Sequence, residues 1–273
     1  MFINLIIILE LSDKMSEKEH EKSKRATDSG NLATRRQANE NFAQSDFDGW
    51  IFDNLNIEPG NSILDVGCGD GKHLFRSLQL ASPNGSVIGI DISQESLDKC
   101  RDLIKQGGLK NINVKFCDLT NIGETFPPPV KFDRIYSSYA IYYTKDANKT
   151  LSDCYNLLND GGILFLCGPT EGSNWEFIEL AQRAGCRKEY KEWSGFLERE
   201  VGTLRSLAGN VEVTYFKNKI VYPSEAALFD YWKSTQLYNK ELEEAMRIVI
   251  AEEFKKKDTF SNTKITIGLR CLK

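Results

Sequence analysis

Short apolar runs alternate with amphipathic stretches along the first two thirds of the chain. The runs predict strands at residues 62–66, 86–91, 113–119 and 163–167, and another that starts at Lys131. Parallel strands covered on both faces are apolar throughout in this way. Between the runs, apolar residues such as Leu97, Cys100 and Ile104 recur at helical spacing. This alternation predicts an α/β fold with helices on both faces of a mostly parallel sheet.

Polar residues at helix starts give further boundaries. Asp146 is a suitable N-cap for a helix that carries Leu157 and Leu158 and stops at the following glycines. Ser173 and Glu176 have the spacing of a capping box, which predicts another helix that ends at Gly185.

The pattern loosens beyond Gly185. Apolar and polar residues alternate over residues 211–216, which predicts a strand with one solvent-exposed face. Residues 224–235 are rich in aromatic residues and have helical spacing. An apolar stripe from Leu242 to Phe254 predicts an amphipathic helix. Residues 264–271 alternate again, which allows a last strand that returns antiparallel into the sheet.

The N-terminal 30 residues need separate treatment. Residues 2–11 are apolar but too short to span a bilayer, and they lack the features of a secretory signal. Met15 is an alternative start, which would make the preceding segment an artefact; a packed N-terminal helix is the other interpretation. We expect residues 1–30 to be a flexible or artefactual tail. Residues 31–55 predict one or two amphipathic helices before the first strand.

Composition excludes several classes of function. The 273 residues include 35 Lys and Arg against 39 Asp and Glu, without a long basic run, so nucleic acid is not the expected partner. Seven cysteines form no C-x-x-C pair, which predicts buried thiols in a cytoplasmic protein. With only His20 and His73 available, we expect no metal site. No membrane partner is expected either.

A glycine loop lies between the first predicted strand and its helix. Asp65 is followed by Gly67, Gly69 and Gly71, and glycines at these positions let the backbone turn and approach a ligand. The dinucleotide fingerprint G-x-G-x-x-G needs a third glycine where this chain has Lys72. The spacing therefore disfavours a nicotinamide cofactor without excluding it.

The D-x-G-x-G-x-G sequence resembles the first motif of class I S-adenosylmethionine-dependent methyltransferases, and the resemblance covers residues from about Phe42 to about Pro169. It implies a Rossmann-like seven-stranded sheet, mostly parallel with an antiparallel C-terminal strand. It also implies a single methyltransferase domain at residues 31–273, in which residues 31–55 and about 186–240 cap the active site. Phe42, Phe47 and Trp50 would then line the mouth of the site, with plain packing on the sheet edge as the alternative.

Acidic residues end the second and third predicted strands. Asp91 lies 20 residues past Gly71 and can accept hydrogen bonds from both ribose hydroxyls, a contact that serves either cofactor class. Ser93 is the better cap for the next helix, which leaves Asp91 available. The resemblance implies that Ile92 packs on adenine and that Asp118 and Leu119 bind the adenine amino group and ring. A turn made by Asp118 with Asn121 is the alternative.

The fourth strand runs into a loop rich in hydroxyl groups, at the edge where ligands of α/β sheets bind. The resemblance implies that this loop contacts the methionine part of the cofactor and faces the acceptor. The expected cofactor-binding residues are Asp65, Gly67, Cys68, Gly69, Gly71, Asp91, Ile92, Cys117, Asp118, Leu119, Ser137 and Ser138. The candidates for a general base are Tyr139, Tyr142, Tyr143 and Glu171. His73 is expected to be structural.

The function that follows is transfer of a methyl group from S-adenosylmethionine to a small-molecule acceptor by in-line displacement. The alternatives are an NAD-dependent oxidoreductase and a non-catalytic protein that binds S-adenosylmethionine. The acceptor, the methylated atom and the oligomeric state stay open at this point.

Overall fold

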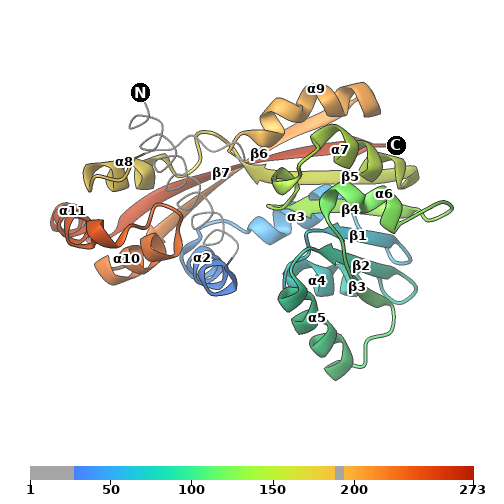
Figure 1. The fold of residues 1–273 in the computed structure, drawn as a ribbon, viewed down its shortest axis with the longest axis horizontal. Helices are drawn as coiled ribbons and strands as arrows, with labels where there is room; N and C mark the ends of the chain where they lie inside the picture. The colour runs from blue at the N-terminus through green and yellow to red at the C-terminus, as the bar shows by residue number, and fades with distance from the viewer. Residues whose placement is uncertain (1–27, 188–193) are drawn as a thin grey trace, which may run out of the picture. The chain divides into compact units, whose positions relative to one another are not determined.

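The computed structural model describes residues 28–187 and 194–273 (Figure 1). The predictions about the N-terminal tail therefore concern residues that lie almost wholly outside the described part. Within that part, no helix has the length and apolar character needed to cross a bilayer.

Seven strands of the described residues form one sheet in the order β3-β2-β1-β4-β5-β7-β6. The strands are β1 (Ser62–Val66), β2 (Ser86–Asp91), β3 (Ile112–Phe116), β4 (Phe132–Ser138), β5 (Leu158–Pro169), β6 (Val211–Tyr222) and β7 (Phe260–Leu272). The pairs β1–β2, β1–β4, β2–β3 and β4–β5 are parallel, whereas β7 runs antiparallel to β5. The predicted mostly parallel sheet with an antiparallel C-terminal strand is confirmed. The order reverses between β1 and β4, where ligands of such sheets bind.

The helices of the described residues are α2 (Ser29–Phe42), α3 (Phe47–Leu55), α4 (Lys72–Ala81), α5 (Gln94–Gln106), α6 (Ile122–Thr125), α7 (Ala147–Asn156), α8 (Trp175–Arg183), α9 (Phe196–Ala208), α10 (Glu225–Ser234) and α11 (Glu243–Lys256). Short 3-10 helices are η1 (Leu119–Asn121), η2 (Ile141–Tyr143) and η3 (Lys240–Leu242). Side chains cap several N-termini as their sequences predict: Ser93 caps α5 and Asp146 caps α7.

Two local predictions are wrong. The Ser173–Glu176 capping box does not form: the Ser173 hydroxyl accepts the N–H of Ile265, and Glu176 accepts the N–H and hydroxyl of Thr263. Both side chains thus form hydrogen bonds with residues of strand β7 instead of capping a helix. The helix α8 begins after Asn174. The helix α7 ends at Asn156, because Leu158 already belongs to β5, which is longer than its apolar run.

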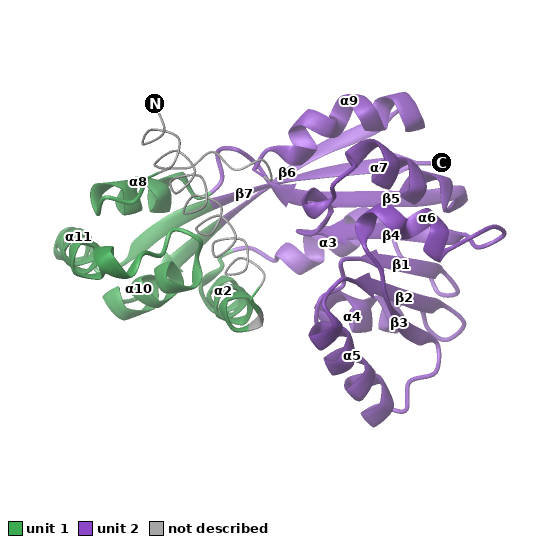
Figure 2. Ribbon diagram, in the orientation of Figure 1, with its two compact units in different colours: residues 1–44, 174–189, 219–263 green, residues 45–173, 190–218, 264–273 purple. Residues whose placement is uncertain are grey.

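The described residues divide into two compact units (Figure 2). Unit 2 comprises the described parts of residues 45–173, 190–218 and 264–273 and contains the glycine loop. Side chains alternate along its strands. Leu64 and Ile135 pack with α6, α7 and α9 on one face of the sheet, while Ile63 and Tyr136 pack with α3, α4 and α5 on the other.

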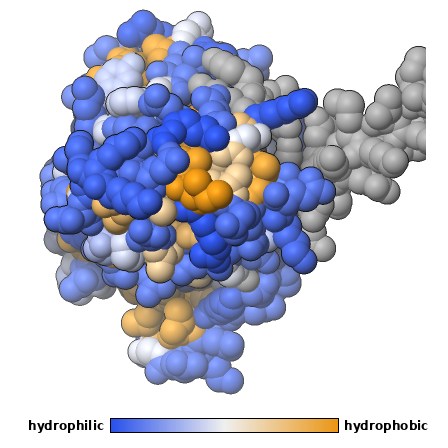
Figure 3. All heavy atoms as spheres, turned by 90° about the vertical axis from the view of Figure 1, so that its left-hand side faces the viewer, coloured by the Kyte–Doolittle hydropathy of each residue, from blue (hydrophilic) through white to orange (hydrophobic). Residues whose placement is uncertain are grey.

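Unit 1 comprises the described parts of residues 1–44, 174–189 and 219–263 and has its own core. That core contains the fully buried ring of Trp232, which lies 5.4 Å from the ring of Phe229 and 5.1 Å from that of Tyr238. The face drawn in Figure 3 is mainly hydrophilic, with several small apolar groups scattered among the polar residues.

Candidate functional site

The glycine loop after β1 keeps its three glycines in the left-handed region of backbone space. The φ angles are +80° at Gly67, +52° at Gly69 and +88° at Gly71, which favours residues without a side chain. A Cβ at Gly67 would lie 2.1 Å from the Cβ of Ala140, and one at Gly71 would lie 2.8 Å from the Phe75 ring. Nothing lies within 4 Å of the position of a Cβ at Gly69. Gly67 and Gly71 thus permit packing, whereas Gly69 faces open space.

Asp91 connects the end of β2 to this loop. Its Oδ2 accepts the backbone N–H of Gly69 at 2.8 Å, and its Oδ1 accepts the N–H of Ser93 at 2.8 Å. The Ser93 hydroxyl in turn caps α5 at Ser96. Ile92, the next residue after Asp91, leaves 61% of its surface exposed. A carboxylate and an exposed apolar side chain therefore lie together at the edge of the glycine loop.

Asp65 is buried below the loop, with 3% of its surface exposed. Its Oδ2 accepts the hydroxyl of Tyr136 at 2.7 Å, and that hydroxyl lies 3.0 Å from the hydroxyl of Ser77 on α4. Burial raises the pKa of Asp65 to about 7, although the charge of His73 and the hydrogen bond from Tyr136 oppose the increase. The side chain of Asp65 thus ties β1 to β4 and α4.

Two thiols hold the carbonyl of Gly69 from inside the protein. The Sγ of Cys68 lies 3.7 Å from the Gly69 oxygen and the Sγ of Cys100 lies 3.4 Å from it. All seven cysteines belong to the described residues and are buried free thiols. The N–H of Gly69 binds Asp91 while its carbonyl binds the thiols, so this residue is fixed on both sides.

The loop after β3 begins with Cys117, whose N–H donates to the carbonyl of Asp91 at 3.0 Å. The Oδ1 of Asp118 accepts the N–H of Thr120 at 3.0 Å and its hydroxyl at 2.8 Å, and these hydrogen bonds lower the pKa of Asp118. A turn was the alternative role of Asp118, and the structure makes one, with Thr120 as side-chain partner and not Asn121. Leu119, predicted as the end of the third strand, is instead the first residue of η1, because β3 ends at Phe116.

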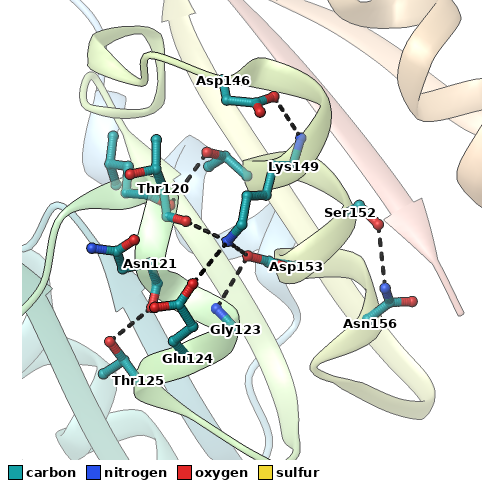
Figure 4. Close-up of polar contacts among 12 residues, drawn as sticks. Thr120, Asn121, Gly123, Glu124, Thr125, Asp146, Lys149, Ser152, Asp153 and Asn156 are labelled. Carbon is teal, nitrogen blue, oxygen red and sulfur yellow. Dashed lines mark hydrogen bonds and ion pairs between the residues drawn. The ribbon is translucent and has the colours of Figure 1, made fainter.

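Lys149 of α7 contacts this loop through its ammonium group (Figure 4). Its Nζ donates to the carbonyl of Thr120 and lies 3.0 Å from Asp153 and 3.9 Å from Glu124. Lys149 also borders a surface cavity of about 620 Å³ between α7 and α9. Because its ammonium group is paired with carboxylates, we assign Lys149 a structural role.

The loop after β4 is fixed at Tyr139. This residue has φ of +58°, its N–H donates to the carbonyl of Cys167 at 2.9 Å, and its hydroxyl lies 2.6 Å from the hydroxyl of Thr266 on β7. A positive φ at a bulky residue is uncommon and strained. Such strained residues cluster at functional sites, where the surrounding structure holds them in place. The next residue is Ala140, which fills the space left open at Gly67.

The two serines before Tyr139 differ in their surroundings. Ser137 is fully buried, and its hydroxyl has no hydrogen-bond partner among the described residues. Ser138 is partly exposed, and its hydroxyl reaches the thiol of Cys167.

The four candidate bases do not form one group. The rings of Tyr142 and Tyr143 lie 4.7 Å apart, and that of Tyr139 lies 6.5 Å from Tyr142. Burial raises the pKa of Tyr142 well above 10. Glu171 contacts α9 instead, with its carboxylate 3.5 Å from Arg199 and its N–H bound to Glu198.

Aromatic residues of α3 lie beside Tyr139. The ring of Phe47 is 5.8 Å from that of Tyr139, 5.8 Å from that of Trp50 and 5.5 Å from that of Phe216 on β6. Phe216 and Thr266 were not among the expected site residues, because the alternation that marks their strands carries no sign of function. Phe42, which the resemblance places with Phe47 and Trp50 at the mouth of the site, packs on Tyr222 within unit 1.

Asp48, the residue after Phe47, joins α3 to the start of α4. Its carboxylate lies 3.1 Å from Lys72 and 3.0 Å from His73. Burial alone would raise the pKa of Asp48, but the hydrogen bond and charge of His73, with those of Lys72, lower it to about 2. His73 thus has the structural partner that its position in the sequence suggested.

The comparisons with known proteins agree with this architecture. Residues 57–245 match the model of a methyltransferase domain family. The chain belongs to this family, and its class is that of the S-adenosylmethionine-dependent methyltransferases. Family membership decides against the NAD-dependent alternative and confirms the predicted cofactor and type of reaction.

The curated relatives are distant. The chain is 27% identical over 165 residues to the aklanonic acid methyltransferase DauC of a Streptomyces species, a match that covers 55% of this chain and 74% of the relative. It is 26% identical over 189 residues to a demethylmenaquinone methyltransferase of Lactobacillus johnsonii, covering 63% and 76%. Three further relatives are matched over only 35%, 26% and 43% of their own lengths.

Solved structures share the fold at low identity. The YcgJ protein of Bacillus subtilis superposes with a TM-score of 0.55 and 15% identity, covering 83% of this chain and 97% of that one. Phosphoethanolamine N-methyltransferase 2 of Haemonchus contortus, solved with S-adenosylmethionine, gives a TM-score of 0.53 and 17% identity, covering 83% and 52%.

Proposed function

We propose that this methyltransferase binds S-adenosylmethionine along the glycine loop and methylates a small-molecule acceptor held by the loop after β4. The observation that carries the proposal is the link between Asp91 and Gly69. It puts a carboxylate suited to ribose hydroxyls next to the one glycine of the loop that faces open space. Exposed Ile92 beside it offers an apolar surface for adenine.

The buried hydroxyl of Ser137 also favours S-adenosylmethionine as the ligand of this site. A buried hydroxyl without a partner costs about 1–3 kcal/mol, and a ligand at the carboxyl end of β4 would complete the hydrogen bonds of this one. Ser137 lies at the carboxyl end of β4, next to β1 across the point where the strand order reverses. Polar groups of the methionine part of S-adenosylmethionine would satisfy this hydroxyl. We assign Cys117, Asp118 and Leu119 to the adenine end and Ser138 to the methionine end.

The protein would contribute to the reaction mainly by positioning the cofactor and the acceptor. When bound, the cofactor supplies a methyl group on a positively charged sulfur, which is already activated for transfer. Asp91 and the glycine loop would fix the cofactor, and the strained backbone of Tyr139 would fix the wall against which the acceptor rests. Holding two reactants in a near-attack geometry contributes about 7–11 kcal/mol.

The setting of this reaction follows from the sequence. We propose a cytoplasmic protein, because its seven cysteines are free thiols. A small acceptor is favoured over nucleic acid by the absence of a basic run in the sequence. Cap elements at residues 31–55 and about 186–240 stay a prediction.

Calorimetric titration tests the cofactor, with S-adenosylmethionine, S-adenosylhomocysteine and NADH offered separately to the full chain. We expect the first two to bind and NADH not to bind; tight binding of NADH alone would overturn the proposal. Transfer of a radiolabelled methyl group to a broad panel of small molecules then distinguishes an enzyme from a protein that only binds the cofactor. Firm cofactor binding without transfer to any member of the panel would favour the non-catalytic alternative.

A further inference from the structure

An aromatic cluster of unit 2 lies next to the proposed cofactor loop. It consists of Phe47 and Trp50 from α3, Tyr139 from the loop after β4, and Phe216 from β6. Ring centroids in the cluster lie 5.2–5.8 Å apart. None of the four side chains is fully buried. Such partly exposed rings offer flat apolar surface to a ligand.

The cluster is continuous with the cofactor loop through two contacts. Ala140, directly after Tyr139, occupies the space beside Gly67. Asp48, directly after Phe47, pairs with Lys72 and His73 at the start of α4, which follows the glycine loop. An acceptor resting on this cluster would therefore lie beside the proposed methyl donor.

Charge around the cluster disfavours a cationic acceptor. Asp46 and Asp48 both flank Phe47 in the sequence. The carboxylate of Asp46 accepts the N–H of Gly49, and that of Asp48 pairs with Lys72 and His73. Glu171, the acidic candidate base, pairs with Arg199. Aromatic rings alone attract an ammonium group, but each of these three carboxylates already has a partner in the protein.

The tyrosines near the cluster are poor proton acceptors. The hydroxyl of Tyr139 is held at 2.6 Å by Thr266, and the pKa of Tyr142 lies well above 10 because the group is buried. A phenol with a high pKa stays protonated at neutral pH and does not act as a base. Neither Tyr139 nor Tyr142 is thus suited to take a proton from the acceptor, which favours an acceptor whose nucleophile ionises by itself.

We propose that the cluster of Phe47, Trp50, Tyr139 and Phe216 is the acceptor-binding surface and that the acceptor is a planar, mainly apolar molecule with an acidic hydroxyl, such as a phenol or an enol. This inference rests on the proposed function. The hydroxyl loses its proton to water, its oxygen forms the bond to the methyl carbon, and the electron pair of the broken carbon–sulfur bond stays on the sulfur.

Binding of probe molecules tests the surface. The probes are 2-naphthol and 2-hydroxy-1,4-naphthoquinone, with cyclohexanol as a non-planar control and phenyltrimethylammonium as a cationic control. Binding to the full chain with S-adenosylhomocysteine present is followed by saturation-transfer NMR. We expect both planar hydroxyl probes to bind about tenfold more tightly than either control. Equal binding of cyclohexanol, or tighter binding of the cation, would overturn the proposal.

Two variants of neighbouring residues on β6 locate the surface. Phe216→Leu should weaken the binding of 2-naphthol by about tenfold. Tyr215→Leu is the matched control, because Tyr215 points to the opposite face of the strand and exposes 56% of its surface. Equal loss in both variants would contradict the assignment. Binding of S-adenosylhomocysteine is measured in the same samples. If the unaltered protein does not bind S-adenosylhomocysteine, the proposed function is refuted. If it binds S-adenosylhomocysteine but none of the planar probes, this inference alone is refuted.

The source of ionisation is tested by pH. The two planar probes differ widely in acidity, so the midpoint of the pH–rate profile for methyl transfer should shift with the pKa of the probe. A midpoint that is the same for both probes would show a base in the protein and would exclude an acceptor that ionises by itself.

Discussion

The carboxylate of Asp91 accepts the backbone N–H of Gly69 at 2.8 Å across the ends of the first two strands. The same carboxylate holds Ser93, the cap of α5. One side chain therefore fixes the glycine loop, where we propose that the cofactor binds, while keeping lone pairs available for ribose hydroxyls. Several tests follow from this arrangement and from the groups buried below it.

Asp91→Ala should reduce the affinity for S-adenosylmethionine by about ten- to a hundredfold, because hydrogen bonds to a charged group contribute about 1.5–3 kcal/mol. Calorimetric titration measures the effect. Asp98→Ala is the control, since Asp98 lies on the outer side of α5, where it pairs with Arg101. Unchanged affinity in the Asp91 variant would mean that this carboxylate serves the loop and not the ligand.

Gly69→Val should abolish cofactor binding while the protein still folds. At φ of +52° the substitution costs about 1–3 kcal/mol of backbone strain, but no protein atom lies within 4 Å of the added Cβ. Gly108→Val is a matched control at the end of α5, with φ of +59° and equally open surroundings. Both variants should lose similar amounts of thermal stability, and only the Gly69 variant should lose binding. Equal binding in the two would reduce the glycine loop to a turn.

Ser137→Ala should affect stability and binding in opposite directions. Without ligand, the variant loses a buried hydroxyl that has no partner, so its melting temperature should stay the same or rise. Its affinity for S-adenosylmethionine should fall by about three- to tenfold, the value of one hydrogen bond. Thr214→Val removes another unpartnered buried hydroxyl and should leave affinity unchanged. Identical cofactor affinity in both variants would remove Ser137 from the site.

Asp65 should make the protein less stable as the pH rises from about 4 to about 7. Its pKa is about 7 in the folded state against 3.8 ordinarily, so within this window the folded state binds more protons than the unfolded state. The stabilisation is complete below pH 4 and is lost as the pH rises through 7, with a slope of about 1.4 kcal/mol per pH unit. Denaturant titrations of Asp65→Asn should lack this slope. A variant with the slope of the unaltered protein would assign it to other groups.

Asp48 should have the opposite pH dependence. Its pKa is lowered from 3.8 to about 2, so its contribution to stability is present above pH 4 and is lost as the pH falls through 2. Asp48→Asn should therefore be less stable at pH 7 by about 1–2 kcal/mol and should show a flatter loss of stability in acid. Equal acid sensitivity of the two proteins would contradict a functional ion pair with Lys72 and His73.

The sequence predicts the features of this molecule that depend on local spacing. Three glycines after an apolar run, and acidic residues at the ends of the next two strands, are readable because strand, turn and helix each impose a short period. The partners of Tyr139 are not readable in this way. Thr266 is 127 residues away in the chain, and it reaches Tyr139 because β7 inserts beside β5. For the same reason, Ser173 and Glu176 form hydrogen bonds with residues of β7 and do not form the expected capping box.

The absence of a side chain at Gly67 gives Ala140 its place, although 73 positions separate the two residues. The loop that carries Tyr139 is therefore shaped by the glycine loop, the proposed site of the methyl donor. In directed evolution for new acceptors, positions 67 and 140 must both stay small, since enlarging either would displace both loops at once. Phe47 and Phe216 belong to the proposed acceptor surface, so libraries that vary these two residues should alter the choice of acceptor and leave the donor unchanged.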